Sequence, residues 1–392
     1  MAKIPLGPWK VGIDHLSPKA SSPDGAARDA LNVYFDRDGG AARRPGYTLQ
    51  DAVAGAHSLW TSPATGRSFC AIGATLYSVS YEGTWLKTAI ATMPSIAPLS
   101  YDDLNEDVVC GNRFGLFRIN ADLEVKSLGL ARPDAPTVSA VSYGGLYQGR
   151  YAVAVARLRD FEEGPLSPSA FIDVPAGGGL LVTTPTNGDS VRLYRTQTNG
   201  DHLFACGSAP AESQHLIGAG EVGWVTENQH LDQMPGGEIV RHWRGLVLSA
   251  RGSILFWSEP MAYGITDPRH NFAQFAHKIT MMQPVDGGVF VGTSEGVIFL
   301  SGSTPKEWSI RKTDGLPAVE GTGVTALASL FGVDAGDGKV ALWLAANGFV
   351  IGTPDGRLIE AQSKRIRLPE SQVAAGVGAA VVHDRQIIAS IN

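Results

Sequence analysis

The sequence predicts an all-β protein, because short apolar runs alternate with turn residues along most of its 392 residues. Its 47 glycines and 23 prolines fall between these runs without a collagen-like period, which favours turns between strands. With 44% hydrophobic and 18% charged residues, the composition is that of a chain that folds around a core. One short helix is expected at residues 24–33, where Asp24 or Ser22 could cap the first turn.

Five segments share one rhythm of strands and turns. Residues 57–91 divide into HSLWTS, SFCAIG, TLYSVSY and TWLKTAIA, and residues 97–129 contain VVCGN, GLFRI and VKSLG. Residues 238–259 hold three runs that are separated by Arg-Gly pairs. Residues 279–313 alternate strands with DGG, SEG and SGSTP, and the segment from residue 338 carries the Asn-Gly and Asp-Gly dipeptides of tight hairpins. Each segment therefore predicts an antiparallel meander.

Repeats of roughly 35 to 45 residues, each made of four short strands, are typical of propeller blades. We therefore expect a β-propeller of about five to seven four-stranded blades, although any antiparallel β protein supplies similar runs. Residues 1–50 are predicted to be an N-terminal arm, and residues 51–131 and 236–392 to form blades. Residues 132–235, with a proline-flanked entry and a long alternating strand, indicate an inserted fibronectin type III-like β-sandwich or two further blades.

Two segments carry a family resemblance. Residues 12–50 contain GIDHLSP, GAARDALNVYFDRDGGAARRPGYTLQ, and residues 241–272 read RHWRGLVLSARGSILFWSEPMAYGITDPRHNF. Both resemble the podovirus-type bacteriophage tail nozzle, also called tail tubular or tail-hub stabilisation protein. This chain departs from the better-known nozzles by being shorter, which leaves open whether it carries their platform and tip domains.

The resemblance implies a structural virion protein of the phage tail, made in the host cytoplasm. It implies a ring of identical subunits, usually a hexamer, around the DNA exit channel. The implied partners are the adaptor or head-tail connector proteins at one end and tail fibre or spike proteins at the other. Viral DNA would pass during ejection without specific binding.

Charge and cysteine content limit the function classes. The net charge of −6 and a pI near 5.9 argue against a protein that grips nucleic acid through a basic field. The three cysteines match neither a disulfide framework nor a CxxC metal site, and we expect buried thiols. The first residues lack a signal-peptide pattern and no long apolar run occurs, so neither secretion by that route nor membrane insertion is expected.

No residue pattern predicts catalysis, a cofactor or a structural metal, so we expect no enzyme. The histidines are dispersed, and the adjacent Glu162 and Glu163 would point to opposite faces of a strand. The glycine-rich segments 177–179 and 336–339 lack the helix start of a phosphate loop. A glycosidase remains the least favoured class.

Two groups of residues are candidates for contacts. The acidic run is a candidate channel-facing loop, although an acidic turn of this kind could also bind calcium or simply be solvated; its members are Asp102, Asp103, Glu106 and Asp107. The arm carries candidate assembly contacts at Arg28, Arg37, Arg43 and Arg44. The alternative function is a host-surface module that binds a receptor or glycan through its loops.

Overall fold

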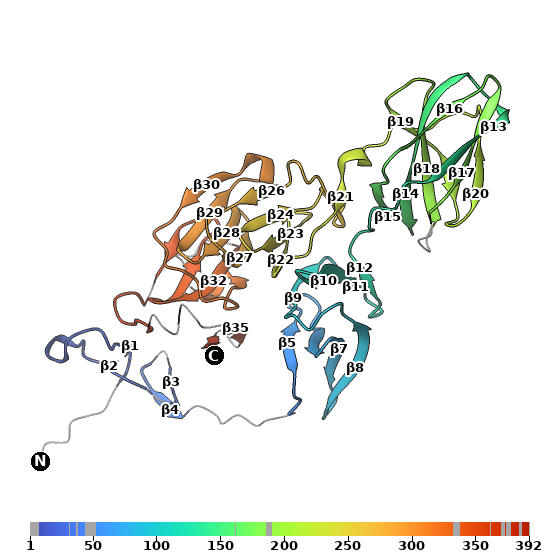
Figure 1. Cartoon of the computed structure of the whole chain (residues 1–392). Coiled ribbons are helices and arrows are strands. Elements are labelled where there is room, and N and C mark those ends of the chain that lie inside the picture. The colour runs from blue at the N-terminus through green and yellow to red at the C-terminus, as the bar shows by residue number, and fades with distance from the viewer. Residues whose placement is uncertain are drawn as a thin grey trace, which may run out of the picture. The chain divides into compact units, whose positions relative to one another are not determined.

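The computed structural model describes residues 8–30, 32–36, 38–43, 52–160, 162–185, 190–331, 338–360, 362–369, 373, 378–383 and 386–391. Its elements are strands, apart from short 3-10 turns at η1 (Lys19–Ser21), η2 (Asn228–His230), η3 (Pro305–Glu307) and η4 (Ala328–Leu330). The expectation of an all-β chain is confirmed for these residues (Figure 1). No helix among them is both long and apolar enough to cross a bilayer.

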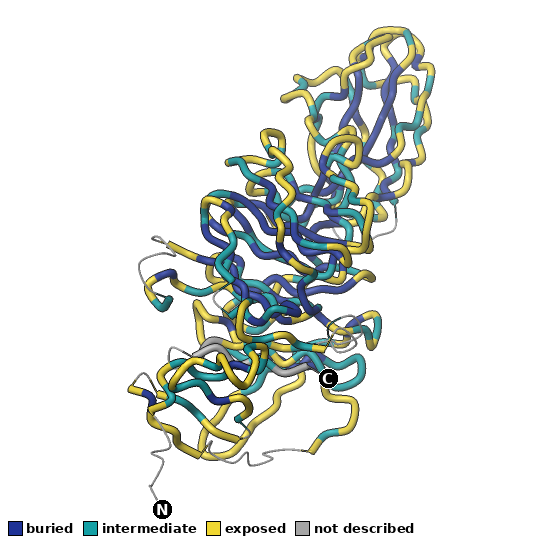
Figure 2. Tube along the Cα trace, turned by 90° about the vertical axis from the view of Figure 1, so that its left-hand side faces the viewer, coloured by how far each residue is buried: buried dark blue, intermediate teal, exposed yellow. Residues whose placement is uncertain are grey.

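The chain divides into two compact units, which are described separately. One unit comprises Met1–Leu59, Val79–Thr88 and Phe275–Asn392, and the other comprises Trp60–Ser78 and Ala89–Gln274. Most of the buried residues belong to strands. Figure 2 colours the buried residues dark blue along the chain trace.

The expected helix at residues 24–33 is wrong. The arm instead forms β1 (Gly12–Ile13), which pairs in parallel with β2 (Ala26–Ala27), and β3 (Val33–Phe35), which pairs with β4 (Ala41–Arg43). Gly25 and Asn32 adopt φ values of 81° and 58°, outside the helical region, so a helix cannot run through the segment.

Two four-stranded meanders lie one after the other in the first half of the chain. Their sheet orders are β5-β6-β7-β8 and β9-β10-β11-β12. The first comprises β5 (Ala56–Thr61), β6 (Ser68–Ile72), β7 (Thr75–Tyr81) and β8 (Trp85–Thr92). The second comprises β9 (Ser100–Leu104), β10 (Asp107–Asn112), β11 (Gly115–Ile119) and β12 (Val125–Ser127). A common core joins them, in which Trp60 stacks on Tyr101 with ring centroids 5.4 Å apart.

A third four-stranded sheet packs on the other face of the β9–β12 sheet. It comprises β22 (Ile239–Trp243), β23 (Leu246–Arg251), β24 (Ile254–Trp257) and β26 (Phe272–Gln274). Val108 and Cys110 of β10 face the core shared with β6 and β7, whereas Val109 faces the core shared with β22 and β23. Strand β10 is consequently buried along its whole length, and burial raises the pKa of the Cys110 thiol to about 12.

The other unit contains two further sheets of four strands that share a core around Trp343. One comprises β27 (Ile279–Val285), β28 (Gly288–Thr293), β29 (Gly296–Ser301) and β30 (Ser309–Lys312). The next comprises β31 (Val324–Leu327), β32 (Lys339–Ala345), β33 (Gly348–Gly352) and β34 (Leu358–Ile359). Phe290 of one sheet lies 5.5 Å from Trp343 of the other, measured between ring centroids. A hairpin of β35 (Gly378–His383) and β36 (Gln386–Ile391) follows.

Strands β13–β20 form a sandwich of two sheets (Figure 1, green). One sheet has the order β13-β17-β20, with strands β13 (Thr137–Leu146), β17 (Gly178–Thr183) and β20 (Gln214–Ile217). The other has the order β15-β14-β18-β19, with β16 also on β14. Its strands are β14 (Gly149–Arg159), β15 (Glu162–Leu166), β16 (Ala170–Val174), β18 (Ser190–Thr196) and β19 (Leu203–Ala209).

The alternation of side-chain size along β14 explains how the sandwich closes. Tyr151, Val153 and Val155 point into the core between the two sheets. The alanines between them, from Ala152 to Ala156, point to the other face and pack in a second cluster with Tyr194. The large side chains therefore fill the sandwich, and the small ones let neighbouring segments approach the outer face.

Close backbone contacts hold the two segments that flank the sandwich in the chain against the segment between β24 and β26. β21 (Asp232–Gln233) pairs with β25 (Ile265–Thr266), and Met234 N–H donates to Gly264 O at 2.9 Å. Gly129 has a φ of 79°, and a Cβ atom at this position would clash with the carbonyl oxygen of Gly264. Both positions therefore need glycine, because no side chain fits between the two backbones.

Candidate functional site

The acidic run lies mostly within strands. Asp102 and Asp103 belong to β9, Asp107 begins β10, and only Asn105 and Glu106 form the turn between the two strands. The glutamate side chain is exposed, whereas Asp107 is buried. The run is therefore a strand-turn-strand segment with one exposed carboxylate at its tip.

Asp102 joins β9 to β22. Its Oδ2 accepts the backbone N–H of His242 at 2.7 Å, and the side chain faces the guanidinium of Arg241. Arg241 Nη1 also donates to Tyr101 O at 3.3 Å and Ser100 Oγ at 3.2 Å. Burial raises the pKa of Asp102 and lowers that of Arg241, although each charge opposes the shift of the other. This pair fixes two neighbouring strands.

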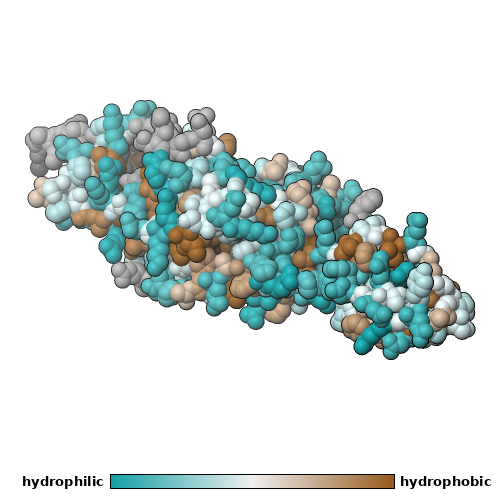
Figure 3. Space-filling view, turned by 90° about the horizontal axis from the view of Figure 1, so that it is seen from above, coloured by the Kyte–Doolittle hydropathy of each residue, from teal (hydrophilic) through white to brown (hydrophobic). Residues whose placement is uncertain are grey.

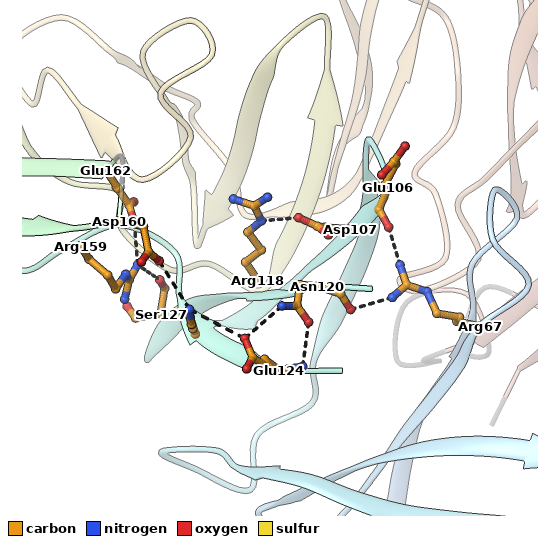
Figure 4. A network of polar contacts seen from close by, with 11 residues as sticks. Arg67, Glu106, Asp107, Arg118, Asn120, Glu124, Ser127, Arg159, Asp160 and Glu162 are labelled. Carbon is orange, nitrogen blue, oxygen red and sulfur yellow. Dashed lines mark hydrogen bonds and ion pairs between the residues drawn. The ribbon is translucent and has the colours of Figure 1, made fainter. Parts of the chain in front are cut away.

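The remaining carboxylates also have partners in the fold. Asp103 accepts hydrogen bonds from the Ser62 hydroxyl and, at 3.3 Å, from the backbone N–H of residue 64. Asp107 accepts a bond from Arg118 Nε, and Arg67 donates to the Glu106 backbone carbonyl (Figure 4). In the described part of the chain no three His, Cys, Asp or Glu side chains are placed to hold a metal ion.

The arm arginines have different environments. Arg28 is exposed but donates to the backbone carbonyls of Ser17 and, at 3.3 Å, His15, so it stabilises the arm itself. Arg43 is exposed at the end of β4. Arg37 and Arg44 lie outside the described residues.

The adjacent glutamates of β15 take different partners, as strand alternation predicts. Glu162 accepts a bond from Arg159 Nη2 at 2.6 Å. Glu163 pairs with Arg192 at 3.1 Å and accepts a hydrogen bond from Tyr194, whose pKa is raised mainly by burial. The separation of their partners argues against a shared proton between the two carboxyl groups.

A cleft of about 490 Å³, with charged and apolar lining residues, lies where the sandwich meets the β9–β12 sheet. Three chain segments line it, with residues between 118 and 128, residues 159–160 and 162–163, and residues 261–265. Its charged side chains include Arg118, Glu124, Lys126, Arg159, Asp160 and Glu162. All of them belong to one compact unit, so the cleft is a feature of a single body.

Ion pairs run through this cleft (Figure 4). Lys126 Nζ lies 3.5 Å from an Asp160 oxygen and 3.8 Å from a Glu124 oxygen. Arg159 binds Glu162 and also donates to the backbone carbonyl of Ser127 at 2.7 Å. The bonds of Lys126 and Arg159 connect β12 of the meander with β14 and the turn that follows it in the sandwich.

An apolar side completes the cleft. Met261 is 70% exposed, and the half-buried Tyr263 donates its hydroxyl to Met261 Sδ at 3.6 Å. The Tyr263 ring also meets the edge of His242, with ring centroids 5.8 Å apart. The sequence carries no signal for these residues, because their segments are far apart in the chain and each alone looks like an ordinary turn.

Comparisons with known proteins identify no family. No family model matches the chain, and no curated protein matches it. Among solved structures, the chain is similar to PorZ, a bacterial surface component of the type-IX secretion system of Porphyromonas gingivalis, with 12% identity and a TM-score of 0.20. The match covers 85% of this chain and 62% of PorZ, so the chain spans under two thirds of that structure. At this TM-score the likeness carries no argument about function.

Proposed function

We propose that the protein is a structural subunit of a bacteriophage tail, which forms a ring around the DNA exit channel. In this role it joins the adaptor or connector to the distal tail parts and performs no chemistry. The proposal combines the resemblance of residues 12–50 and 241–272 to tail nozzle proteins with the recurrence of four-stranded sheets.

The observation that carries the proposal is the placement of the first strands of successive sheets. Between β9 and β22, Val240 N–H donates to Ser100 Oγ at 3.0 Å. Between β27 and β31, Thr325 Oγ1 donates to Gln283 Oε1 at 3.1 Å. Blades that radiate from an axis bring their first strands together in this way, which supports a propeller. The two-sheet core of β13–β20 similarly supports an inserted fibronectin type III-like module.

The net negative charge of the chain is suited to a channel through which DNA passes. Each phosphate that a protein neutralises adds salt-dependent affinity, which would retard DNA passage. The net charge of −6 opposes such binding, and the exposed Glu106 is the member of the acidic run that could face a channel. The face drawn in Figure 3 is mainly hydrophilic, with apolar side chains in small, separate patches. We expect no measurable affinity for duplex DNA at physiological salt.

Assembly tests this function directly. Native mass measurement of the purified chain, with negative-stain imaging, is expected to give closed rings, and co-expression with the adaptor should give a joint complex. A heterologous contact that closes by rotation would hold such a ring. A monomer or trimer that binds host cells by itself would contradict the proposal and favour the alternative of a host-surface module.

The arm offers a finer test. Because Arg28 is used within the arm, the exposed Arg43 is the better candidate for a contact with the next subunit. Arg43→Glu is expected to lower the fraction of rings without changing the thermal unfolding of the monomer. Lys312→Glu, at an exposed cation that ends β30, is the matched control. Equal ring formation by Arg43→Glu and the wild type would show that Arg43 of the arm does not contribute to the interface between subunits.

A further inference from the structure

We infer that the cleft between the sandwich and the β9–β12 sheet binds a neutral oligosaccharide. The inference concerns a site within one compact unit and does not depend on ring formation. Its volume of about 490 Å³ lies within the range of roughly 300–1,000 Å³ that is common for small-molecule sites.

Each charged side chain that lines the cleft has a partner of opposite charge, in the lining or beside it. Arg118 pairs with Asp107, and Arg159 pairs with Glu162 (Figure 4). Lys126 lies between Glu124 and Asp160, and Glu163 pairs with Arg192. A cation or anion entering such a lining gains little, because each charge is already compensated. A neutral ligand with many polar groups can still gain affinity, because it forms hydrogen bonds with the charged side chains without needing an uncompensated charge.

Hydroxyl groups match the lining because each can donate and accept. Carboxylates only accept hydrogen bonds, and ammonium and guanidinium groups only donate them. Arg118 uses Nε for Asp107, and its two terminal nitrogens point away from that carboxylate (Figure 4). The side chains are accessible, with exposed fractions of 56% for Arg118, 50% for Lys126 and 72% for Asp160. Charge-assisted bonds to sugar hydroxyls are therefore available.

The apolar side supplies the second requirement of sugar binding. A pyranose ring presents a face of C–H groups, which packs on an aromatic ring or a thioether. Tyr263 and Met261 offer these two surfaces on one loop. Because the His242 ring contacts Tyr263 edge-on, the aromatic ring is held in place before a ligand arrives.

The cleft is built from fixed backbone. Met234 N–H binds Gly264 O, Gly129 lies against Gly264, and Arg159 binds the carbonyl of Ser127 across the junction. These bonds hold the three lining segments together in the free protein. A preformed site avoids part of the ordering cost of binding, which favours a ligand that makes several modest contacts.

The test measures binding of defined sugars to the full chain by ligand-observed NMR and calorimetry. Maltotriose, triacetylchitotriose and lactose are the neutral probes, and sialyllactose and inorganic phosphate are the charged ones. We expect at least one neutral probe to bind in the millimolar range or tighter, and the charged probes to bind more weakly. Tyr263→Ala should weaken binding at least about tenfold, and Asp160→Asn and Lys126→Met should each weaken it.

Matched controls separate the cleft from other surfaces. Tyr147→Ala removes a tyrosine that is 82% exposed on the sandwich, and Lys278→Met removes an exposed lysine whose partner is Glu320. Both controls should keep the affinity of the wild type. Circular dichroism checks that each variant folds, and the exposed Asp160→Asn keeps the test valid if Tyr263→Ala does not fold.

Three results would overturn the inference. The first is that no neutral probe binds at high millimolar concentration. The second is that a charged probe binds more tightly than every neutral one, which would make this an ion site. The third is that binding survives the cleft variants as well as it survives the controls. None of these results bears on ring formation, which is measured separately.

Discussion

The sandwich and the four-stranded meanders close their cores in different ways. The two sheets of β13–β20 face each other, and their core draws only on residues of those strands. Each meander instead completes its core with the next sheet, as β10 does on both faces. This difference implies that the sandwich should fold and unfold as a separate unit, whereas the stability of a meander depends on the sheets next to it.

The largest effect is expected from Phe290→Ala. Phe290 is fully buried and lies 4.6 Å from Phe299 and 5.5 Å from Trp343, measured between ring centroids. Its removal should lower the free energy of unfolding of this region by about 3–5 kcal/mol. Hydrogen exchange should accelerate together in β27–β30 and β31–β34, because the two sheets share the core. Acceleration in only one sheet would show that their cores are independent.

Leu193→Ala tests whether the sandwich unfolds independently of the meanders. Leu193 is fully buried in the core of the sandwich. The substitution should cost about 2–5 kcal/mol and should raise hydrogen exchange within residues 137–217 alone. If protection were also lost in β9–β12, the sandwich would not be a separate unit.

Gly129→Ala tests the backbone contact between the end of the β9–β12 sheet and the segment between β24 and β26. Its Cβ would meet the backbone of Gly264, so we expect a loss of about 1–3 kcal/mol, measured by denaturant unfolding. Gly177→Ala is the matched control, since Gly177 has a similar φ of 74° but no atom within 4 Å of the place that the added methyl group would take. Equal losses in both variants would assign the effect to the backbone angle alone.

The smallest effect is expected from acidification of the arm. Asp14 accepts the backbone N–H of Ser17 at 3.0 Å and the Ser17 hydroxyl at 2.8 Å, and these bonds lower the pKa of its carboxyl group. A lowered folded pKa means that the stabilisation is present above the ordinary value of about 3.9 and is lost as the pH falls through the folded value. The protection factors for hydrogen exchange at residues 11–17, corrected for the intrinsic pH dependence of exchange, should therefore fall below about pH 4. Asp14→Asn should remove this pH dependence, and its persistence would point to another group.

Much of the strand pattern could be predicted because the turns are local. Asn347 and Gly348 stand at the predicted hairpin between β32 and β33, and the DGG turn separates β27 from β28. Strand β9 was missed because SYDDL looks like a polar turn. Its aspartates are accommodated by Arg241 and Ser62, which lie far away in the sequence.

The cleft could not be predicted for the same physical reason. Its three segments meet through contacts between residues far apart in the chain, since Gly129 lies against Gly264 and Arg159 donates to Ser127 O. Beside Gly264, the two-residue strands β21 and β25 pair with each other. Pairing of such short strands depends on tertiary contacts and leaves no periodic pattern in the sequence. No local pattern in the sequence therefore links Lys126 to Asp160, whose charged groups the fold places 3.5 Å apart.

The arm binds the segment near residue 366, which the ribosome makes much later than the arm. His15 N–H donates to Arg365 O at 3.1 Å, and Arg367 N–H donates to the His15 ring at 2.9 Å. The two sides are 352 residues apart in the chain. At ribosomal rates, His15 must wait about 20–70 s after its own synthesis before residues 365–367, which it binds, are made. During translation the arm is thus open to chaperones and to other newly made chains.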